Sequence, residues 1–294
     1  MKPAGRGGRM KLSAITDEIS QDFEHALAVL QEYGAHGAEL RGLWGTNIGD
    51  LSDEQVKRAK RALRTAGIAV SCLASPFFKC DMNSSEAAVA GRMHLASARS
   101  YDQQFQLLER LCQLAHEFET RLIRVFAFWR RGNLTPEIED HIVAAFEKPL
   151  TIAEQHDVVL CLENEHACYL GTGAEVGRVA RRISSPRLLV CWDPGNALSA
   201  GEVPYPDGYE HVRGLVAHVH VKDGSRTNGE LKWCVVGEGV IDYQGQFAAL
   251  RKDNYSGYIS LETHYVPPGG TSEDGSRPSL AALKRLIGEQ PANG

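Results

Sequence analysis

The sequence VVLCLENE at residues 158–165 has the pattern of a buried β-strand that ends in acidic side chains. Three later segments repeat this pattern of a short apolar run followed at once by polar residues: LLVCWDP (188–194), VAHVHVK (216–222) and YISLETH (258–264). The spacing between them is about that of one strand-plus-helix unit. Each segment therefore places a polar side chain at the carboxyl end of a strand.

Four earlier segments have the same strand character: KLSAIT (11–16), GAEL (37–40), AVSCLAS (69–75) and RLIRVFAF (121–128). Helical patterns separate the eight strands, and Ser52 with Gln55 has the form of a capping box at the start of one helix. Strand and helix alternate eight times without a linker, which predicts an α/β protein, a single-domain (β/α)8 TIM barrel over residues 10–294. Residues 1–9 are basic and glycine-rich, and we expect them to form a flexible N-terminal extension.

Several connecting segments also have a predicted character. Residues 82–120 are expected to be mostly helical and to contain an additional short helix, because the segment is longer than one crossover requires. Segments 199–210 and 223–239 follow candidate ligand strands, so they are expected to be loops over the mouth of the barrel, where active sites lie. A loop at 265–277 should precede the last helix, at 278–288.

The overall composition is that of an ordinary soluble globular protein, with 294 residues, 43% hydrophobic and 23% charged. A formal charge of -5 argues against a nucleic-acid partner, which normally requires a basic face. No apolar run is long enough for a transmembrane helix, and the start of the chain lacks the apolar stretch of a signal peptide. Seven cysteines without CxxC spacing are typical of a protein in the reducing cytoplasm.

The strand-end residues Glu163, Asp193, His220 and Glu262 are the strongest functional signal. A parallel barrel gathers the carboxyl ends of its strands around one point. Carboxylates brought together there repel each other by about 4 kcal/mol per pair at 4 Å and an effective dielectric of 20, and a divalent cation would offset this repulsion. An aspartate before Pro-Gly is by itself more often a turn former, but four such residues on successive strands favour a metal site. Three carboxylates and one imidazole suit one Mn²⁺, Mg²⁺ or Co²⁺ ion, with Zn²⁺ as a further candidate.

Such a site suggests proton transfer next to a carbonyl group. A metal that holds a carbonyl and the neighbouring hydroxyl stabilises an enediolate. Glu163 and Glu262 lie on different strands, so one carboxylate can remove a proton and the other can return one. This is the requirement for isomerisation or epimerisation of a small sugar or related polyhydroxy carbonyl compound.

These residues lie in motifs that resemble the xylose isomerase-like TIM-barrel superfamily, the sugar phosphate isomerase/epimerase group. The resemblance spans nearly the whole chain, through AITDEIS, GAELRG, LENE, DPGN, HVHVKD, GEG-IDY and LETHY. It implies that Glu163, Asp193, His220 and Glu262 bind one divalent metal. In the ketose 3-epimerase branch the two glutamates are also the acid/base pair. Family resemblance further suggests a homodimer or homotetramer.

The same resemblance marks two positions that contact substrate in the epimerase branch. One is a histidine three residues after the metal-binding aspartate, and here that position is Asn196. The other is an arginine six residues after the metal-binding histidine, and Arg226 matches it. The asparagine departs from the epimerase pattern and leaves the sugar specificity open.

Other polar residues near strand ends are secondary candidates for substrate binding. Glu39 and Arg41 share a face of the second strand and form either an internal ion pair or a substrate contact. Lys222 either binds an oxyanion or pairs with Asp223 or another carboxylate.

Further side chains are expected near the ligands. Buried Arg124 should pair with a carboxylate such as Glu39 or Glu163. His166 and His264 follow the ligand glutamates and are candidates for orienting a ligand. Glu238 is a candidate to reach the site from its loop, although a turn role for the flanking glycines is the simpler interpretation.

Three functions remain open from the sequence. The first is the metal-dependent isomerase or epimerase. The second is a dehydratase of the inosose or 3-dehydroshikimate type, which begins with the same proton abstraction. The least favoured is a non-catalytic sugar-binding barrel, because both glutamates are present. The abasic-site endonuclease branch of the same superfamily is disfavoured, because the chain lacks that branch's additional histidines.

Overall fold

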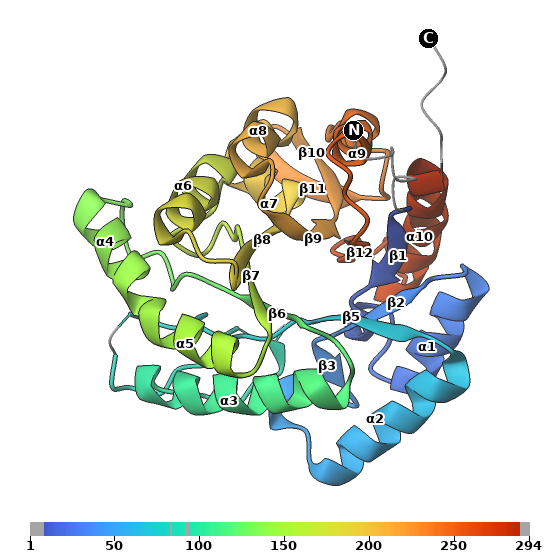
Figure 1. Cartoon of the computed structure of the whole chain (residues 1–294). Coiled ribbons are helices and arrows are strands. Elements are labelled where there is room, and N and C mark those ends of the chain that lie inside the picture. The colour runs from blue at the N-terminus through green and yellow to red at the C-terminus, as the bar shows by residue number, and fades with distance from the viewer. Residues whose placement is uncertain (1–8, 83, 92–93, 289–294) are drawn as a thin grey trace, which may run out of the picture.

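The computed structural model describes residues 9–82, 84–91 and 94–288. Within them, eight parallel strands form one sheet in the order β1-β12-β9-β8-β7-β6-β5-β2. Their bounds are β1 (Lys11–Ala14), β2 (Gly37–Leu40), β5 (Ala69–Leu73), β6 (Leu122–Val125), β7 (Val159–Glu163), β8 (Leu188–Trp192), β9 (Val216–Val221) and β12 (Tyr258–Leu261). The two ends of this order meet through a parallel bridge between Ile15 and Glu39, so the barrel is nearly closed (Figure 1).

The predicted (β/α)8 TIM barrel is confirmed, and each of the eight predicted segments contains one barrel strand. The predicted extension over residues 1–9 lies, except for Arg9, outside the described residues. None of the helices in the described part of the chain combines the length and apolarity that crossing a bilayer requires.

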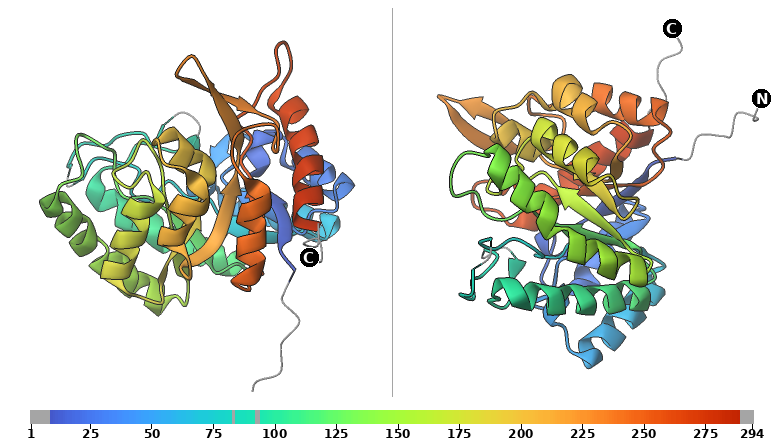
Figure 2. Two further views of the ribbon diagram at one scale, coloured as in Figure 1. Left: turned by 90° about the horizontal axis from the view of Figure 1, so that it is seen from above. Right: turned by 60° about the vertical axis from the view of Figure 1, so that its left-hand side comes forward.

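Helices surround the barrel in sequence order (Figures 1 and 2). Their bounds are α1 (Phe23–Glu32), α2 (Asp53–Ala66), α3 (Tyr101–Glu117), α4 (Pro136–Ala145), α5 (Glu147–Gln155), α6 (Gly173–Ile183), α7 (Pro194–Ser199), α8 (Tyr209–Val212), α9 (Tyr243–Lys252) and α10 (Ser272–Gly288). The predicted capping box is present at α2, where Ser52 accepts a hydrogen bond from the Gln55 amide. Such a cap satisfies backbone amide groups that have no hydrogen-bond partner within the first turn of the helix.

The apolar core lies between the strands and the surrounding helices, whereas the interior of the barrel is more polar. Leu30, Leu108 and Leu283 are among the fully buried side chains of the core cluster. The barrel interior instead holds the thiols of three cysteines. Cys161 and Cys191 lie two residues before Glu163 and Asp193, on the same face of their strands, and Cys72 lies opposite Glu39 on the neighbouring strand. Burial raises the pKa of these thiols, so they fill the barrel as neutral groups below the mouth.

The segment 82–120 is helical only in its second part. The described residues 82, 84–91 and 94–100 contain no α-helix, and an antiparallel bridge joins Ala88 to Arg99. The prediction of a mostly helical segment is therefore wrong before α3. Its polar groups find tertiary partners instead: Asn47 donates to the carbonyl of His94, and Asp50 accepts from the Ser97 amide.

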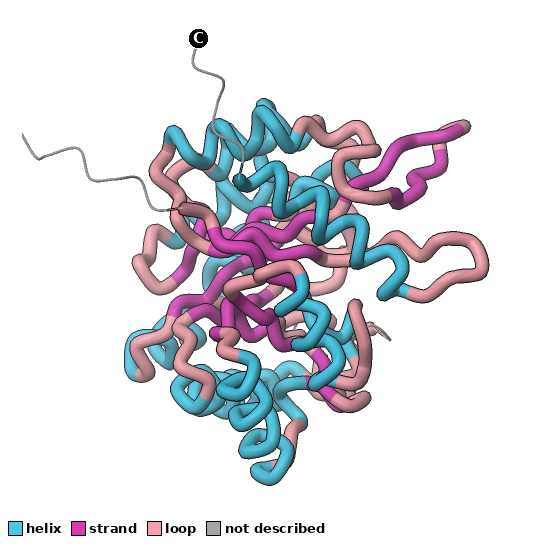
Figure 3. Tube along the Cα trace, turned by 90° about the vertical axis from the view of Figure 1, so that its right-hand side faces the viewer, coloured by secondary structure: helices cyan, strands magenta, loops and turns pink. Residues whose placement is uncertain are grey.

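The segment 223–239 begins with a β-hairpin, formed by β10 (Asp223–Thr227) and β11 (Glu230–Cys234). The two residues between the strands, Asn228 and Gly229, both have positive φ angles. An Asn-Gly pair favours this two-residue hairpin turn, so the sequence contained the signal for a hairpin rather than a plain loop. The hairpin and the loop before α10 project from the same side of the barrel (Figures 2 and 3).

Short elements connect the main strands and helices, among them η2 (Ile48–Asp50). A two-stranded hairpin of β3 (Gly42–Leu43) and β4 (Thr46–Asn47) follows β2. The predicted loop 199–210 contains a short helical turn, η4 (Pro204–Gly208), which contacts α6, α7 and α9. Helix α10 begins at Ser272, six residues before the predicted start, because Thr271 caps it through the Asp274 amide.

Candidate metal and catalytic centre

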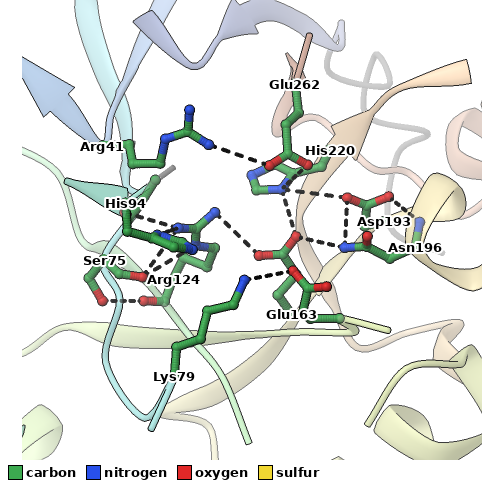
Figure 4. A network of polar contacts seen from close by, with 12 residues as sticks. Arg41, Ser75, Lys79, His94, Arg124, Glu163, Asp193, Asn196, His220 and Glu262 are labelled. Carbon is green, nitrogen blue, oxygen red and sulfur yellow. Dashed lines mark hydrogen bonds and ion pairs between the residues drawn. The ribbon is translucent and has the colours of Figure 1, made fainter. Parts of the chain in front are cut away.

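The four strand-end residues meet at the carboxyl ends of β7, β8, β9 and β12 (Figure 4). One ligand atom from each of Glu163, Asp193, His220 and Glu262 lies within 4.8 Å of the other three, and all four side chains are buried. His220 Nδ1 is 3.1 Å from Glu163 Oε1 and 3.9 Å from oxygens of both Asp193 and Glu262. The sequence therefore predicted which side chains come together. That they bind a metal stays a prediction.

The charges around the mouth fit a divalent cation. Among the described residues, the buried carboxyl groups at this end of the barrel include Asp17, Glu18, Glu39, Glu163, Asp193, Asp223 and Glu262, and the buried lysines and arginines are Arg41, Lys79, Arg124 and Lys222. Negative charge is thus in excess in a place where water does not screen it. Glu163 Oε2 is also buried without a hydrogen-bond partner among these residues. A set of three carboxylates and one imidazole suits Mn²⁺, Mg²⁺, Co²⁺ or Zn²⁺.

Lys222 supplies the positive charge nearest to the four-residue cluster. Its Nζ contacts Asp193 Oδ2 and Glu262 Oε2, and these carboxylates hold the pKa of Lys222 well above its usual value against the effect of burial. The sequence left open whether this lysine pairs with a carboxylate, and the structure pairs it with two of the predicted ligands. Gly195 makes the approach possible, since a Cβ there would overlap the Lys222 side chain.

Glu39 orients His220 from the side of the imidazole opposite the three carboxylates. Its two oxygens lie 2.8 Å from His218 Nε2 and 3.0 Å from His220 Nε2. Burial disfavours the charge of Glu39, but the two imidazoles hold its pKa well below the usual value. Because Nε2 of His220 faces Glu39, Nδ1 faces the three carboxylates, and a carboxylate behind a ligand histidine fixes its tautomer and orientation. The expected alternative of a Glu39–Arg41 ion pair is wrong, since the two side chains have different partners.

Two arginines hold the two glutamates. Arg124 Nη1 is 3.3 Å from Glu163 Oε2, as predicted for a buried arginine that needs a carboxylate. Arg41 Nη1 is 3.8 Å from Glu262 Oε1, and the same guanidinium pairs more closely with Asp17 and Glu18. Figure 4 shows the two arginines on the same side of the cluster, each directed at its own glutamate.

Asn196 links two of the predicted ligands. Its Nδ2 donates to Glu163 Oε1 at 3.2 Å and to Asp193 Oδ2 at 3.1 Å. Asp193 caps α7 by accepting from the Asn196 amide, which fixes the asparagine in this position. His166 Nδ1 lies 3.0 Å from Glu165 and 3.4 Å from Asn196 Oδ1, so it approaches the cluster only through the asparagine. Substrate contact by Asn196 or His166 stays a prediction.

Two predicted substrate-binding residues lie away from the cluster. Arg226 is exposed on the hairpin, where it donates to the carbonyls of Leu198 and Ser199. Glu238 is exposed and lines a surface hollow with Pro278, while its neighbour Gly237 donates to Asp223. This arrangement agrees with the turn role of the glycines. Neither side chain is among those brought together at the four-residue cluster.

The sequence interpretation missed Asp17 and Glu18, which lie in the short turn η1 (Thr16–Glu18) after β1. Both are buried, and burial raises the pKa of Glu18 to about 7 although Arg41 opposes the shift. They line a cavity of about 430 Å³ that also borders His264, whose Nε2 is 3.7 Å from Glu262. The strand-end pattern that marked Glu163 would also have marked these residues.

The comparison with known proteins agrees with this geometry. A model of the xylose isomerase-like TIM barrel matches residues 27–286. The chain belongs to the xylose isomerase-like TIM barrel family. The predicted resemblance is thereby confirmed.

A curated relative with a known activity is 3-oxo-isoapionate decarboxylase from Pectobacterium atrosepticum. It is 25% identical over 221 residues, which cover 69% of this chain and 78% of the decarboxylase.

Solved structures of the same fold include several enzymes. The probable 3-DHS dehydratase AsbF from Bacillus anthracis has a TM-score of 0.73 at 18% identity, covering 93% of this chain and 98% of that one. D-allulose 3-epimerase from Methylomonas sp. has a TM-score of 0.69 at 15% identity, covering 95% and 98%. The IOLI protein with a bound zinc atom has a TM-score of 0.74 at 16% identity, again covering 95% and 98%. The fold therefore supports epimerase and dehydratase chemistry in different proteins.

Proposed function

We propose that this protein is a divalent-metal-dependent isomerase or epimerase of a small sugar or related polyhydroxy carbonyl compound. The observation that supports this most directly is the convergence of four ligand atoms within 4.8 Å at the barrel mouth. Perturbed, buried ionisable groups concentrated at such a place are typical of a catalytic site.

Glu163, Asp193, His220 and Glu262 would hold the metal. A divalent cation there would polarise the substrate carbonyl and make the neighbouring C–H bond more acidic. Asn196 keeps Glu163 and Asp193 together, and Glu39 keeps Nδ1 of His220 directed at them.

Glu163 and Glu262 would transfer the protons. They come from β7 and β12, which lie on different sides of β9 and β8 in the sheet. One carboxylate oxygen accepts the proton from the substrate carbon, and the other carboxyl group returns a proton to the same or the adjacent carbon. Arg124 beside Glu163 and Arg41 beside Glu262 restrict how each side chain is placed.

Decarboxylation of a 3-oxo acid is the second candidate, because the decarboxylase is the curated relative whose match extends over two thirds of the chain. In that reaction the bond between the carboxylate carbon and the neighbouring carbon breaks, and CO2 leaves. The electron pair moves toward the carbonyl oxygen, and one proton is then added to carbon. Only one proton donor is required, so one of the two glutamates would be dispensable for turnover.

The test is a panel of ketoses, inososes and 3-oxo sugar acids supplied to the Mn²⁺-loaded protein in deuterated water. Deuterium entering recovered or isomerised sugar supports the proposal. Release of CO2 supports the decarboxylase instead, and a growing ultraviolet absorbance from a conjugated product indicates a dehydratase. Binding of sugars without exchange, CO2 release or absorbance change would contradict catalysis and favour a binding protein.

A further inference from the structure

The cavity next to Glu262 extends away from the four-residue cluster. One wall consists of Asp17 and Glu18, which form the turn η1 (Thr16–Glu18) after β1, together with Arg41. The rest of the lining comes from segments far apart in the chain: Trp233 on the hairpin, Val266 in the loop before α10, and the polar side chains of Gln21, Thr263 and Ser272. The hairpin and this loop both project from the mouth of the barrel (Figures 2 and 3).

The first wall accepts hydrogen bonds but has no unpaired cation among its described residues. Glu18 is 3% exposed, and its Oε2 has no hydrogen-bond partner in the described part of the chain. Arg41 forms ion pairs with two carboxylates, with Nε 3.0 Å from Asp17 Oδ2 and Nη1 2.8 Å from Glu18 Oε1. A buried acceptor of this kind needs a donor, and a substrate hydroxyl group is a suitable one.

Part of the remaining lining is apolar. The ring of Trp233 meets His264 edge to face at 5.2 Å between centroids, which fixes the indole beside the predicted metal ligand Glu262. Leu95 and Val266 are 38% and 51% exposed, and both line the same cavity. The indole offers a surface for the C–H face of a sugar ring.

We propose that this cavity is a subsite for the part of the substrate remote from the reacting carbon, and that it takes an uncharged, hydroxylated ring or chain and rejects a phosphate ester. This inference rests on the proposed function, because it extends the same site. At about 430 Å³ the cavity is within the usual size of small-molecule pockets. A phosphate placed there would face two carboxyl groups and an arginine that already has its partners.

The experiment uses full-length protein loaded with Mn²⁺ and a panel of neutral sugars, inososes and methyl glycosides, each with its phosphate ester where one exists. Dissociation constants are measured by calorimetry. We expect the best neutral ligand to bind at least tenfold more tightly than its phosphate ester. Equal or tighter binding of the esters would overturn the proposal, as would a panel in which no neutral sugar binds.

Two variants test whether the ligand binds in this cavity. Trp233→Leu and Glu18→Gln should each weaken binding of the best neutral ligand about tenfold, and Trp233→Leu should leave Mn²⁺ affinity unchanged. Val203→Ala, at an exposed aliphatic side chain outside the cavity, and Glu54→Gln, in an exposed ion pair with Lys57, are controls and should change neither value. Unaltered ligand binding in both cavity variants would overturn the assignment.

Deuterium exchange separates this inference from the proposed function. If deuterium exchange occurs but phosphate esters bind more tightly, the proposed subsite is contradicted and the proposed function is still supported. If neutral ligands bind more tightly and both cavity variants weaken their binding, but no deuterium exchange occurs with any ligand, the subsite is supported. The proposed function is then contradicted.

Discussion

The two halves of the barrel contribute differently to the site. The carboxyl-terminal half, with β7, β8, β9 and β12, supplies the four side chains that converge. The amino-terminal half supplies three of the groups that hold them: Glu39 from β2, Arg41 after it, and Arg124 from β6. The reacting side chains thus come from one half, whereas the other half only positions charges that burial would otherwise destabilise. Substitutions in each half, and removal of the metal, test this difference.

The largest effect is expected from the carboxyl-terminal half. Glu163→Gln and Glu262→Gln should each lower kcat about a thousandfold, because an amide can neither accept nor return the proton. The measurement is turnover of the best substrate together with metal content by mass spectrometry. Glu154→Gln, on the exposed face of α5, is the matched control and should be neutral. Full activity in either variant would rule out the paired-glutamate mechanism, and full activity in only one would favour decarboxylation.

The next effect concerns the amino-terminal half. Arg124→Met should destabilise the metal-free protein by about 3–5 kcal/mol, because it leaves the buried carboxylate of Glu163 without its cation. Chemical denaturation measures the change. Arg131→Met removes an exposed ion pair with Asp81 and should cost less than about 1 kcal/mol. A loss no larger for Arg124 than for Arg131 would show that the amino-terminal half does not compensate the ligand charges.

Metal removal should have a somewhat smaller effect on stability. An ion at 100 times its dissociation constant contributes about 2.7 kcal/mol, so chelation should lower Tm by roughly 5 °C or more. Calorimetry with EDTA, followed by titration of Mn²⁺, Co²⁺ and Zn²⁺, measures the loss and its recovery. Glu262→Gln should largely abolish the recovery. A Tm that responds to no divalent cation would contradict the metal site.

The smallest effect is expected at the contact between the halves. Glu39→Gln keeps the shape of the side chain but weakens its hold on His220, and metal affinity should fall about 10–100-fold. Competition with a fluorescent chelator measures the affinity. Glu32→Gln, which breaks an exposed pair with Arg277, is the control. If Mn²⁺ affinity is the same in both variants, Glu39 has only a structural role.

Residues of the carboxyl-terminal half were the easier ones to predict. Glu163 and His220 lie at the ends of apolar runs, and the alternation of a strand places them on the inner face whatever the rest of the chain does. Glu163 was among the carboxylates named as possible partners of Arg124, because a buried guanidinium requires one. The same strand-end pattern marks Glu18, and the Asn228–Gly229 turn marks the hairpin; both signals were present and not used.

Other features had no signal in the sequence. An ion pair between Glu39 and Arg41, two residues away, was one of two alternatives left open, but barrel closure puts Glu39 opposite His218 and His220, which are about 180 residues further along. The irregular course of residues 94–100 likewise depends on Asn47 and Asp50, whose side chains bond to the backbone of His94 and Ser97. Such partners are chosen by the three-dimensional arrangement of strands, and local periodicity contains no information about them.

The sequence alone determined the barrel, the order of its strands along the chain and the identity of the four converging side chains, because period-two alternation and strand ends are local properties. Tertiary structure alone decided which cation or imidazole lies beside each carboxylate, and that Glu18, Trp233 and His264 line one cavity. Pairing energies between buried charges depend on separation and desolvation, and only the closed barrel sets both.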